Sequence, residues 1–187
     1  NGASCPSLLL EPSRTNLIPQ SEPFSGGDWL LFANSTIESN FGISPEGVQN
    51  AAKVSSYGGA NDFIYDVVNV VSGVTYTVSC FVKNIDSLRT KVYGVNIIDF
   101  EIYWNGADIN SVVGTNVGYE DYGNGWYRVW QTSTATGTTF VARFYSDNQS
   151  SGGGSTLLYG YQAEASSYPT SYIPNHSGGG SVTRAAD

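Results

Sequence analysis

Residues 123–132 read Gly-Asn-Gly-Trp-Tyr-Arg-Val-Trp-Gln-Thr, and this stretch decides the fold. Asn-Gly takes up positive φ readily, so the stretch opens as a tight turn and continues as a strictly alternating run. Successive side chains of a β-strand point to opposite sides. Trp126, Arg128 and Trp130 therefore share one side of the predicted strand. The opposite side, centred on Val129, is expected to be buried.

The side with the two tryptophans has an unusual composition for a protein core. A buried guanidinium needs a polar partner, and the sequence around Arg128 supplies none. We therefore expect Trp126, Arg128 and Trp130 to form an exposed aromatic and cationic stripe that stacks on a flat ligand. In the alternative, the tryptophans only cover the edge of the core. A ligand site is then expected around Tyr93 and Trp104.

Alternation continues on both sides of this stretch and predicts the fold class. The clearest strand, Thr75 to Lys83, places Tyr76, Val78, Cys80 and Val82 inward, and Thr77, Ser79, Phe81 and Lys83 outward. Further strands are expected at residues 29–32, 61–71, 91–103, 109–113, 139–145 and 155–163, with a hairpin turn at Asn105-Gly106. Helical periodicity is missing, so we predict an all-β, antiparallel β-sandwich of the jelly-roll type with less than about a tenth helix.

The 187 residues have room for one well-buried domain. We predict a single β-sandwich domain over residues 1–174. It begins with an extended arm over residues 1–23, in which prolines block helix and the run Leu8-Leu9-Leu10 serves as an apolar anchor. Residues 175–187 are poor in apolar side chains and are predicted to be a linker-like tail. The chain opens without Met or a visible signal peptide, so we interpret it as a segment with covalently linked neighbouring domains.

Charge and composition exclude several classes of partner. The net charge is −8 and only 13% of the residues are charged, which argues against binding nucleic acid or an anionic membrane surface. An anionic glycan held locally by one or two arginines stays compatible with this balance. The longest apolar runs are shorter than the ~18 residues that a membrane-spanning helix needs.

Residues for catalysis or for a metal are scarce. The single histidine, His176, lies in the Gly/Ser-rich tail, so a His-based triad or a zinc site has almost no material. Asp99 and Glu101 lie about 7 Å apart on one predicted strand, but glycosidase carboxylates normally come from different strands of a cleft. We expect no catalysis. Cys80 is predicted to be a small buried side chain, and a Cys5–Cys80 disulfide is the alternative.

Several blocks of the chain resemble a family of β-sandwich modules found in phage tail proteins and in secreted bacterial polysaccharide-degrading enzymes. These blocks are Ser4-Cys5-Pro6-Ser7-Leu8-Leu9-Leu10-Glu11-Pro12, Arg14-Thr15-Asn16-Leu17, Tyr76-Thr77-Val78-Ser79, Gly123-Asn124-Gly125-Trp126-Tyr127-Arg128, Tyr159-Gly160-Tyr161-Gln162-Ala163-Glu164, Pro169-Thr170-Ser171-Tyr172-Ile173-Pro174 and Val182-Thr183-Arg184. The layout is also similar to jelly-roll carbohydrate-binding modules. The resemblance implies an extracellular accessory domain, secreted or on a virion surface, that binds glycans and holds a structural calcium ion.

For the calcium, Glu11 and Glu164 are the expected ligands, because hard cations prefer carboxylate oxygens. Either carboxylate can pair with Arg14 or Arg184 instead.

Aromatic faces stack on sugar rings, and polar side chains hydrogen-bond to the hydroxyls. The predicted ligand-binding residues are Trp126, Arg128, Trp130, Tyr93, Trp104, Tyr103, Phe81 and Lys83. The leading hypothesis is a non-catalytic carbohydrate-binding module that recognises a neutral or weakly charged polysaccharide, with an algal or plant source among the candidates. The second hypothesis is a structural or receptor-binding domain of a phage tail or surface protein, without a sugar site.

Overall fold

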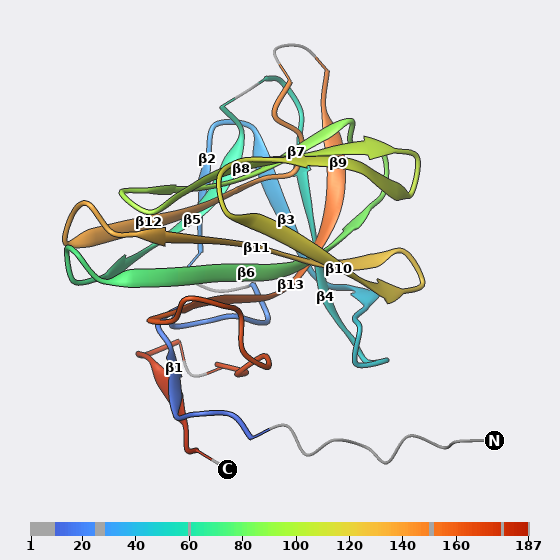
Figure 1. Ribbon diagram of the computed structural model, residues 1–187. Helices are drawn as coiled ribbons and strands as arrows, with labels where there is room; N and C mark the ends of the chain where they lie inside the picture. Colours follow the sequence, from blue (N-terminus) through green and yellow to red (C-terminus); the bar gives the residue numbers. More distant parts are fainter. Residues whose placement is uncertain (1–9, 25–28, 60, 150–151, 177, 187) are drawn as a thin grey trace.

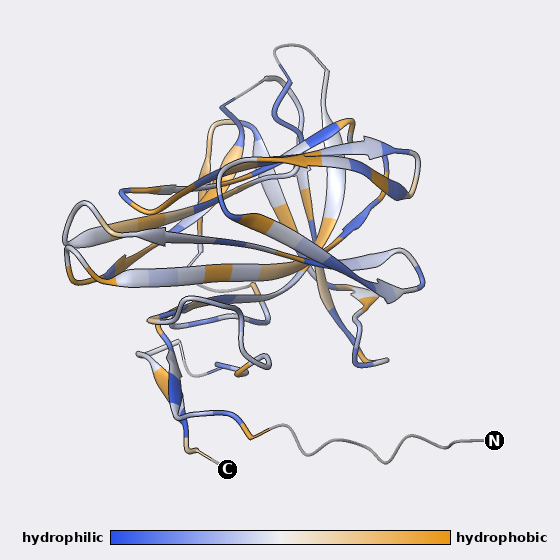
Figure 2. Cartoon of the chain, in the orientation of Figure 1, coloured by the Kyte–Doolittle hydropathy of each residue, from blue (hydrophilic) through white to orange (hydrophobic). Residues whose placement is uncertain are grey.

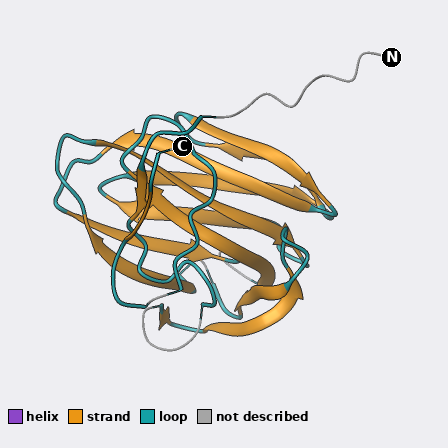
Figure 3. Ribbon diagram, turned by 90° about the horizontal axis from the view of Figure 1, so that it is seen from below, coloured by secondary structure: helices purple, strands orange, loops and turns teal. Residues whose placement is uncertain are grey.

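The computed structural model describes residues 10–24, 29–59, 61–149, 152–176 and 178–186. Two six-stranded antiparallel sheets face each other, and a small two-stranded sheet lies against the outer side of one of them (Figure 1). None of the described residues is helical (Figure 3), so no described helix is available to cross a membrane. The predicted all-β antiparallel sandwich is confirmed.

Each large sheet mixes strands from distant parts of the chain. The first sheet has the order β10 (Val117–Gly123), β11 (Trp126–Thr134), β6 (Thr75–Asn84), β13 (Gly154–Glu164), β4 (Gln49–Ser56), β3 (Ser35–Ile43). The second sheet has the order β2 (Leu30–Phe32), β5 (Phe63–Asn69), β12 (Thr139–Tyr145), β7 (Arg89–Val95), β8 (Ile98–Asn105), β9 (Asp108–Val113). The two-stranded sheet joins β1 (Arg14–Asn16) to β14 (Val182–Arg184).

The core between the sheets follows the predicted alternation. In the antiparallel pair β11–β6, Val129 lies opposite Cys80, and both side chains are fully buried. The inward side chains of β6 predicted from sequence, Tyr76, Val78, Cys80 and Val82, all belong to the main apolar cluster. Figure 2 shows apolar positions interspersed with polar ones along the strands of both sheets, and the inward side chains of these strands form the core. Cys80 is thus a buried thiol, as predicted, whereas Cys5 lies outside the described residues.

The described parts of the two terminal segments, within residues 10–24 and 173–186, pack against the outer side of the first sheet, on the side away from the second sheet (Figures 1 and 3). The segment from Asn175, expected to be a linker, carries β14, which pairs with β1, and Asn175 itself is fully buried. The linker expectation is wrong because this polar tail finds its partners in the N-terminal arm, such as the Ile18 carbonyl and the Thr15 hydroxyl. Leu8 and Leu9 lie outside the described residues, and Leu10 is exposed.

Candidate functional site

The predicted stripe lies on the outer side of the first sheet, where Trp126 and Arg128 are buried and Trp130 is partly exposed. Trp126 and Arg128 are only 3% and 6% exposed, and Trp130 packs on Gly118, where an added Cβ would lie 2.5 Å from the indole ring. The expectation of a solvent-facing stripe is therefore wrong for Trp126 and Arg128. Trp126 instead joins a second apolar cluster beneath the terminal segments, together with Phe81.

Arg128 is buried because a distant segment supplies the partner that its neighbours in sequence lack. Its Nη2 atom donates to the backbone carbonyl of Thr170 at 2.6 Å and to Ser79 Oγ at 3.1 Å. The guanidinium carbon lies 5.4 Å from the centre of the Phe81 ring. Phe81 and Arg128 face each other across the neighbouring strands β6 and β11. Together they fix the C-terminal segment to the sheet.

A pocket of about 420 Å³ opens beside Arg128, with Phe81, Tyr159 and Tyr172 in its wall. Most of its hydrogen-bonding groups are already occupied by protein partners. The hydroxyls of Tyr159 and Tyr172 donate to the carboxylate of Glu22 at 3.0 and 2.9 Å. Burial raises the pKa of Glu22 above its ordinary value, although both hydroxyls oppose this rise. This pocket therefore serves mainly to attach the two terminal segments to the sheet.

Lys83 shows the same pattern as Arg128. Its Nζ donates to the carbonyl of Asn124 at 2.6 Å, and it lines a neighbouring hollow of about 280 Å³ together with Trp126. Phe81, Lys83, Trp126 and Arg128 thus gather on one side of the sheet, where they support the terminal segments and the β10–β11 turn.

The two carboxylates predicted to hold calcium do not fit that role. Glu164 is fully buried, and its oxygens accept hydrogen bonds from the Gln162 amide and from the backbone N–H and hydroxyl of Thr170. Glu11 forms an ion pair with Arg184 at 2.7 Å, which is the alternative that the sequence left open. Among the described residues, no group of three or more His, Cys, Asp or Glu side chains comes together as a metal site.

The other predicted ligand-binding residues lie in the second sheet and divide into two groups. Trp104 points into the core, is 7% exposed and donates its indole N–H to Thr90 Oγ1, so it cannot stack on a ligand. Tyr93 and Tyr103 are partly exposed on the outer side of the sheet. Both tyrosines belong to a surface of the second sheet that the terminal segments do not cover.

We call this surface the Tyr93 face. It consists of outward side chains of β5, β12, β7 and β8: Tyr65, Arg143, Lys91, Tyr93, Arg89, Asp99, Glu101 and Tyr103. The strand register brings Tyr65, Arg143, Tyr93 and Asp99 into one row across four strands. Neighbouring strands lie about 4.8 Å apart, so this row offers contacts over a length of roughly 15 Å.

Cations and aromatic rings alternate on the Tyr93 face. The Arg143 guanidinium lies between two rings, with its central carbon 4.7 Å from the Phe63 centroid and 5.3 Å from that of Tyr93. Lys91 Nζ lies 5.2 Å from the Tyr93 centroid and 2.8 Å from Asp99. These contacts hold long side chains against the sheet, which reduces the conformational entropy that a ligand would otherwise have to remove.

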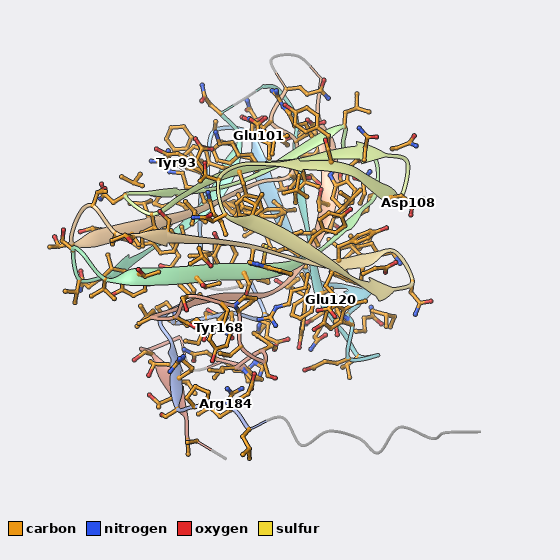
Figure 4. All side chains as sticks on the ribbon, viewed as in Figure 1. Tyr93, Glu101, Asp108, Glu120, Tyr168 and Arg184 are labelled. Carbon is orange, nitrogen blue, oxygen red and sulfur yellow. The ribbon has the colours of Figure 1, made fainter. Side chains whose placement is uncertain are left out.

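Three hollows border these residues. One of about 270 Å³ is lined by Asn61, Lys91, Tyr93, Arg143, Tyr145 and Asn148. Another of about 320 Å³ is lined by Leu88, Arg89, Tyr103 and Gln149, and the largest, of about 490 Å³, includes Tyr93 and Asp99. Figure 4 shows Tyr93 and Glu101 on the side of the sandwich away from Tyr168 and Arg184. The face is thus remote from the chain ends.

Sequence reasoning missed four residues of this face: Tyr65, Arg89, Lys91 and Arg143. The run Thr139 to Tyr145 reads Thr-Phe-Val-Ala-Arg-Phe-Tyr and places a lone arginine in an alternating apolar strand. That signal is the same one that singled out Arg128. Without the register of the sheets, nothing in the sequence shows which of the two arginines is covered.

Comparisons with known proteins give a likeness in fold. The chain matches none of the protein-family models and none of the curated proteins in sequence. Similar solved structures include the enzymatically active domain of tailspike protein 4 of bacteriophage CBA120, with 12% identity, a TM-score of 0.46, and 73% of this chain and 19% of that chain covered.

Two other similar structures contain xylan-related modules. In the CBM22-1–GH10 part of Clostridium thermocellum xylanase 10B, complexed with xylohexaose, identity is 12%, the TM-score is 0.48, and 83% of this chain and 28% of that chain are covered. The CBM22-1 xylan-binding domain of Paenibacillus barcinonensis Xyn10C has 10% identity and a TM-score of 0.43, and the match covers 82% of this chain and 94% of that chain. These identities and TM-scores are too low to infer a function from the similar structures, so the function is inferred from the site itself.

Proposed function

We propose that this chain is a non-catalytic carbohydrate-binding module that holds a polysaccharide along the Tyr93 face. The observation that carries the proposal is the row Tyr65, Arg143, Tyr93 and Asp99, which places aromatic rings beside charged hydrogen-bonding groups on an uncovered sheet. A sugar ring can complement this row, because its C–H faces stack on aromatic rings and its hydroxyls form hydrogen bonds with polar side chains.

The state of the hydrogen-bonding groups favours this side of the molecule over the pocket beside Arg128. Among the described residues, no hydrogen bond or ion pair engages Arg143, whereas Arg128 is held by Ser79 and Thr170. A binding surface needs groups that are in place but not yet occupied. Arg143 is such a group on the Tyr93 face, whereas the pocket beside Arg128 has used most of its own.

The same geometry argues for binding rather than catalysis. Asp99 forms an ion pair with Lys91, and Glu101 accepts hydrogen bonds from Tyr103 and Asn148 and lies 3.7 Å from Arg89. Both carboxylates come from one strand, β8, and are engaged by neighbouring cations or donors, whereas glycosidases use a carboxyl pair that flanks the scissile bond. The proposal includes an extracellular setting as an accessory part of a longer enzyme or fibre.

The test is affinity electrophoresis against algal, plant and microbial polysaccharides, followed by Tyr93→Ala. A stacked aromatic ring contributes on the order of 1–2 kcal/mol, so we expect roughly tenfold weaker binding of the retained polysaccharide. The melting temperature should stay within a few degrees of the parent, because Tyr93 is partly exposed. Tyr168→Ala is the matched control, since Tyr168 is 48% exposed on the opposite side (Figure 4).

Equal losses in Tyr93→Ala and Tyr168→Ala would contradict the assignment of the site. Retention by none of the polysaccharides would favour the alternative of a structural or receptor-binding domain.

A further inference from the structure

The charges on the Tyr93 face divide into pairs and leave one cation over. Lys91 is matched by Asp99 at 2.8 Å, and Arg89 is matched by Glu101 at 3.7 Å. Arg143 has no carboxylate partner among the described residues, and its Nε atom is buried without a hydrogen bond. A guanidinium in this state has already lost part of its hydration and gains more from an anion than an exposed arginine does.

The hollow next to Arg143 has a lining suited to an anion. Arg143 and Lys91, the latter already paired with Asp99 at 2.8 Å, share it with the side chains of Asn61 and Asn148, and no carboxylate belongs to its lining. This is unusual in a chain with 16 acidic and only eight basic residues. At about 270 Å³ the hollow accommodates one small group or one sugar unit rather than a long stretch of chain.

The geometry of Arg143 favours a planar oxyanion. Phe63 and Tyr93 lie at 4.7 and 5.3 Å from the guanidinium carbon and restrict the orientation of its plane. The planar fork of a guanidinium matches the two oxygens of a carboxylate, which it binds through two parallel hydrogen bonds. One unmatched cation fits a ligand with one negative charge in this hollow. A densely sulfated polysaccharide would bring more negative charges than the hollow can match.

We propose that the ligand of the Tyr93 face is an acidic polysaccharide built from uronic acids, and that a sugar carboxylate binds Arg143 and Lys91 in this hollow. The inference rests on the proposed glycan binding and narrows it to one class of polysaccharide. The aromatic rings stack on the sugar, and Arg143 selects the carboxylate.

The experiment compares each polyuronate with its own carboxyl-reduced form, in which the carboxylates have become neutral primary alcohols. Pectate, alginate and glucuronan, their reduced forms, and sulfated polysaccharides as a separate group are tested with the whole chain. For the polyuronate that is retained, we expect at least roughly tenfold tighter binding than for its reduced form, with the difference shrinking at high salt. Since this comparison uses the parent protein, it does not depend on the folding of a variant.

Arg143→Gln should abolish the preference for the carboxylate while leaving binding of the reduced form within about twofold. Lys53→Gln is the matched control, because Lys53 also lies over an aromatic ring, Phe41 at 4.9 Å, but on β4 of the first sheet. Arg143→Lys should recover part of the preference, since it restores the charge without the planar fork.

The outcomes separate this inference from the proposed function. Retention of neutral or sulfated polysaccharides without any polyuronate, or equal binding of a polyuronate and its reduced form, overturns the inference and leaves glycan binding in place. An Arg143→Gln variant that keeps the full preference also overturns it. Failure to retain any polysaccharide overturns both proposals.

Discussion

Arg128 and Arg143 are both arginines in alternating strands and both lie over aromatic rings, but their surroundings give them different roles. The guanidinium of Arg128 bonds to the Thr170 carbonyl beneath a covering segment, whereas that of Arg143 lies on an uncovered sheet. At the residue scale, what distinguishes them is a hydrogen-bond partner 42 positions away in the sequence.

This contrast predicts opposite effects of two substitutions. Arg128→Ala removes two buried hydrogen bonds and the packing of a long side chain, so we expect a loss of about 2–4 kcal/mol in the free energy of unfolding. Arg143→Ala loses only contacts at a partly exposed site and should cost about 1 kcal/mol or less. Chemical denaturation measures both. At temperatures where each variant is folded, Arg128→Ala should retain polysaccharide affinity and Arg143→Ala should not; the reverse result would return the site to the first sheet.

At the scale of elements, the N-terminal arm and the C-terminal segment meet around a buried carboxylate. Glu22 is 1% exposed and accepts hydrogen bonds from Tyr159, Tyr172 and the Asn50 amide. Burial raises its pKa above the ordinary 4.5. The carboxyl group of Glu22 therefore binds its proton more tightly in the folded state than in the unfolded state. The resulting stabilisation is fully present below pH 4.5 and is lost as the pH rises through the raised pKa.

We accordingly expect Glu22→Gln to remove this part of the pH dependence of the melting temperature. The amide side chain keeps an oxygen that accepts hydrogen bonds but has no proton to lose. Thermal melts followed by circular dichroism between about pH 4 and pH 8 give the comparison, with the slope of the variant expected to be flatter than that of the parent. Identical slopes would show that Glu22 titrates with an ordinary pKa.

The elements also show which strands a sequence can reveal. Among the strands with one side in the core, β6, β11 and β12 carry a clear alternation and were predicted close to their observed limits, whereas β4, with Ala52 and Val54 in the core, was not predicted. The strands β3 and β10 are the two edges of the first sheet and expose most of their side chains, so their sequences show no such pattern. The short strands β1 and β14 exist because the two chain ends meet, which depends on the finished fold.

At the scale of the whole molecule, the two outer sides of the sandwich have different surroundings. The terminal segments cover the first sheet, while the second sheet is open (Figure 1). Sequence reasoning identified the sandwich and the inward side chains, but it placed the stripe of Trp126 and Arg128 in solvent. Alternation shows that two sets of side chains face opposite ways. It does not show whether a distant segment covers the outward set, and that covering decides which side is available to a ligand.

This separation predicts that stability and binding respond to different parts of the molecule. Removing residues 181–187 deletes β14 and Arg184, so β1 loses its partner strand and Glu11 loses its 2.7 Å ion pair. We expect a loss of about 2 kcal/mol, which lowers the melting temperature of a domain of this size by roughly 4–8 °C. The polysaccharide affinity measured well below that temperature should not change, because the Tyr93 face lies on the other sheet. A shortened chain that is folded but no longer binds would show that the terminal segments take part in recognition, and the pocket beside Arg128 would then become the better candidate.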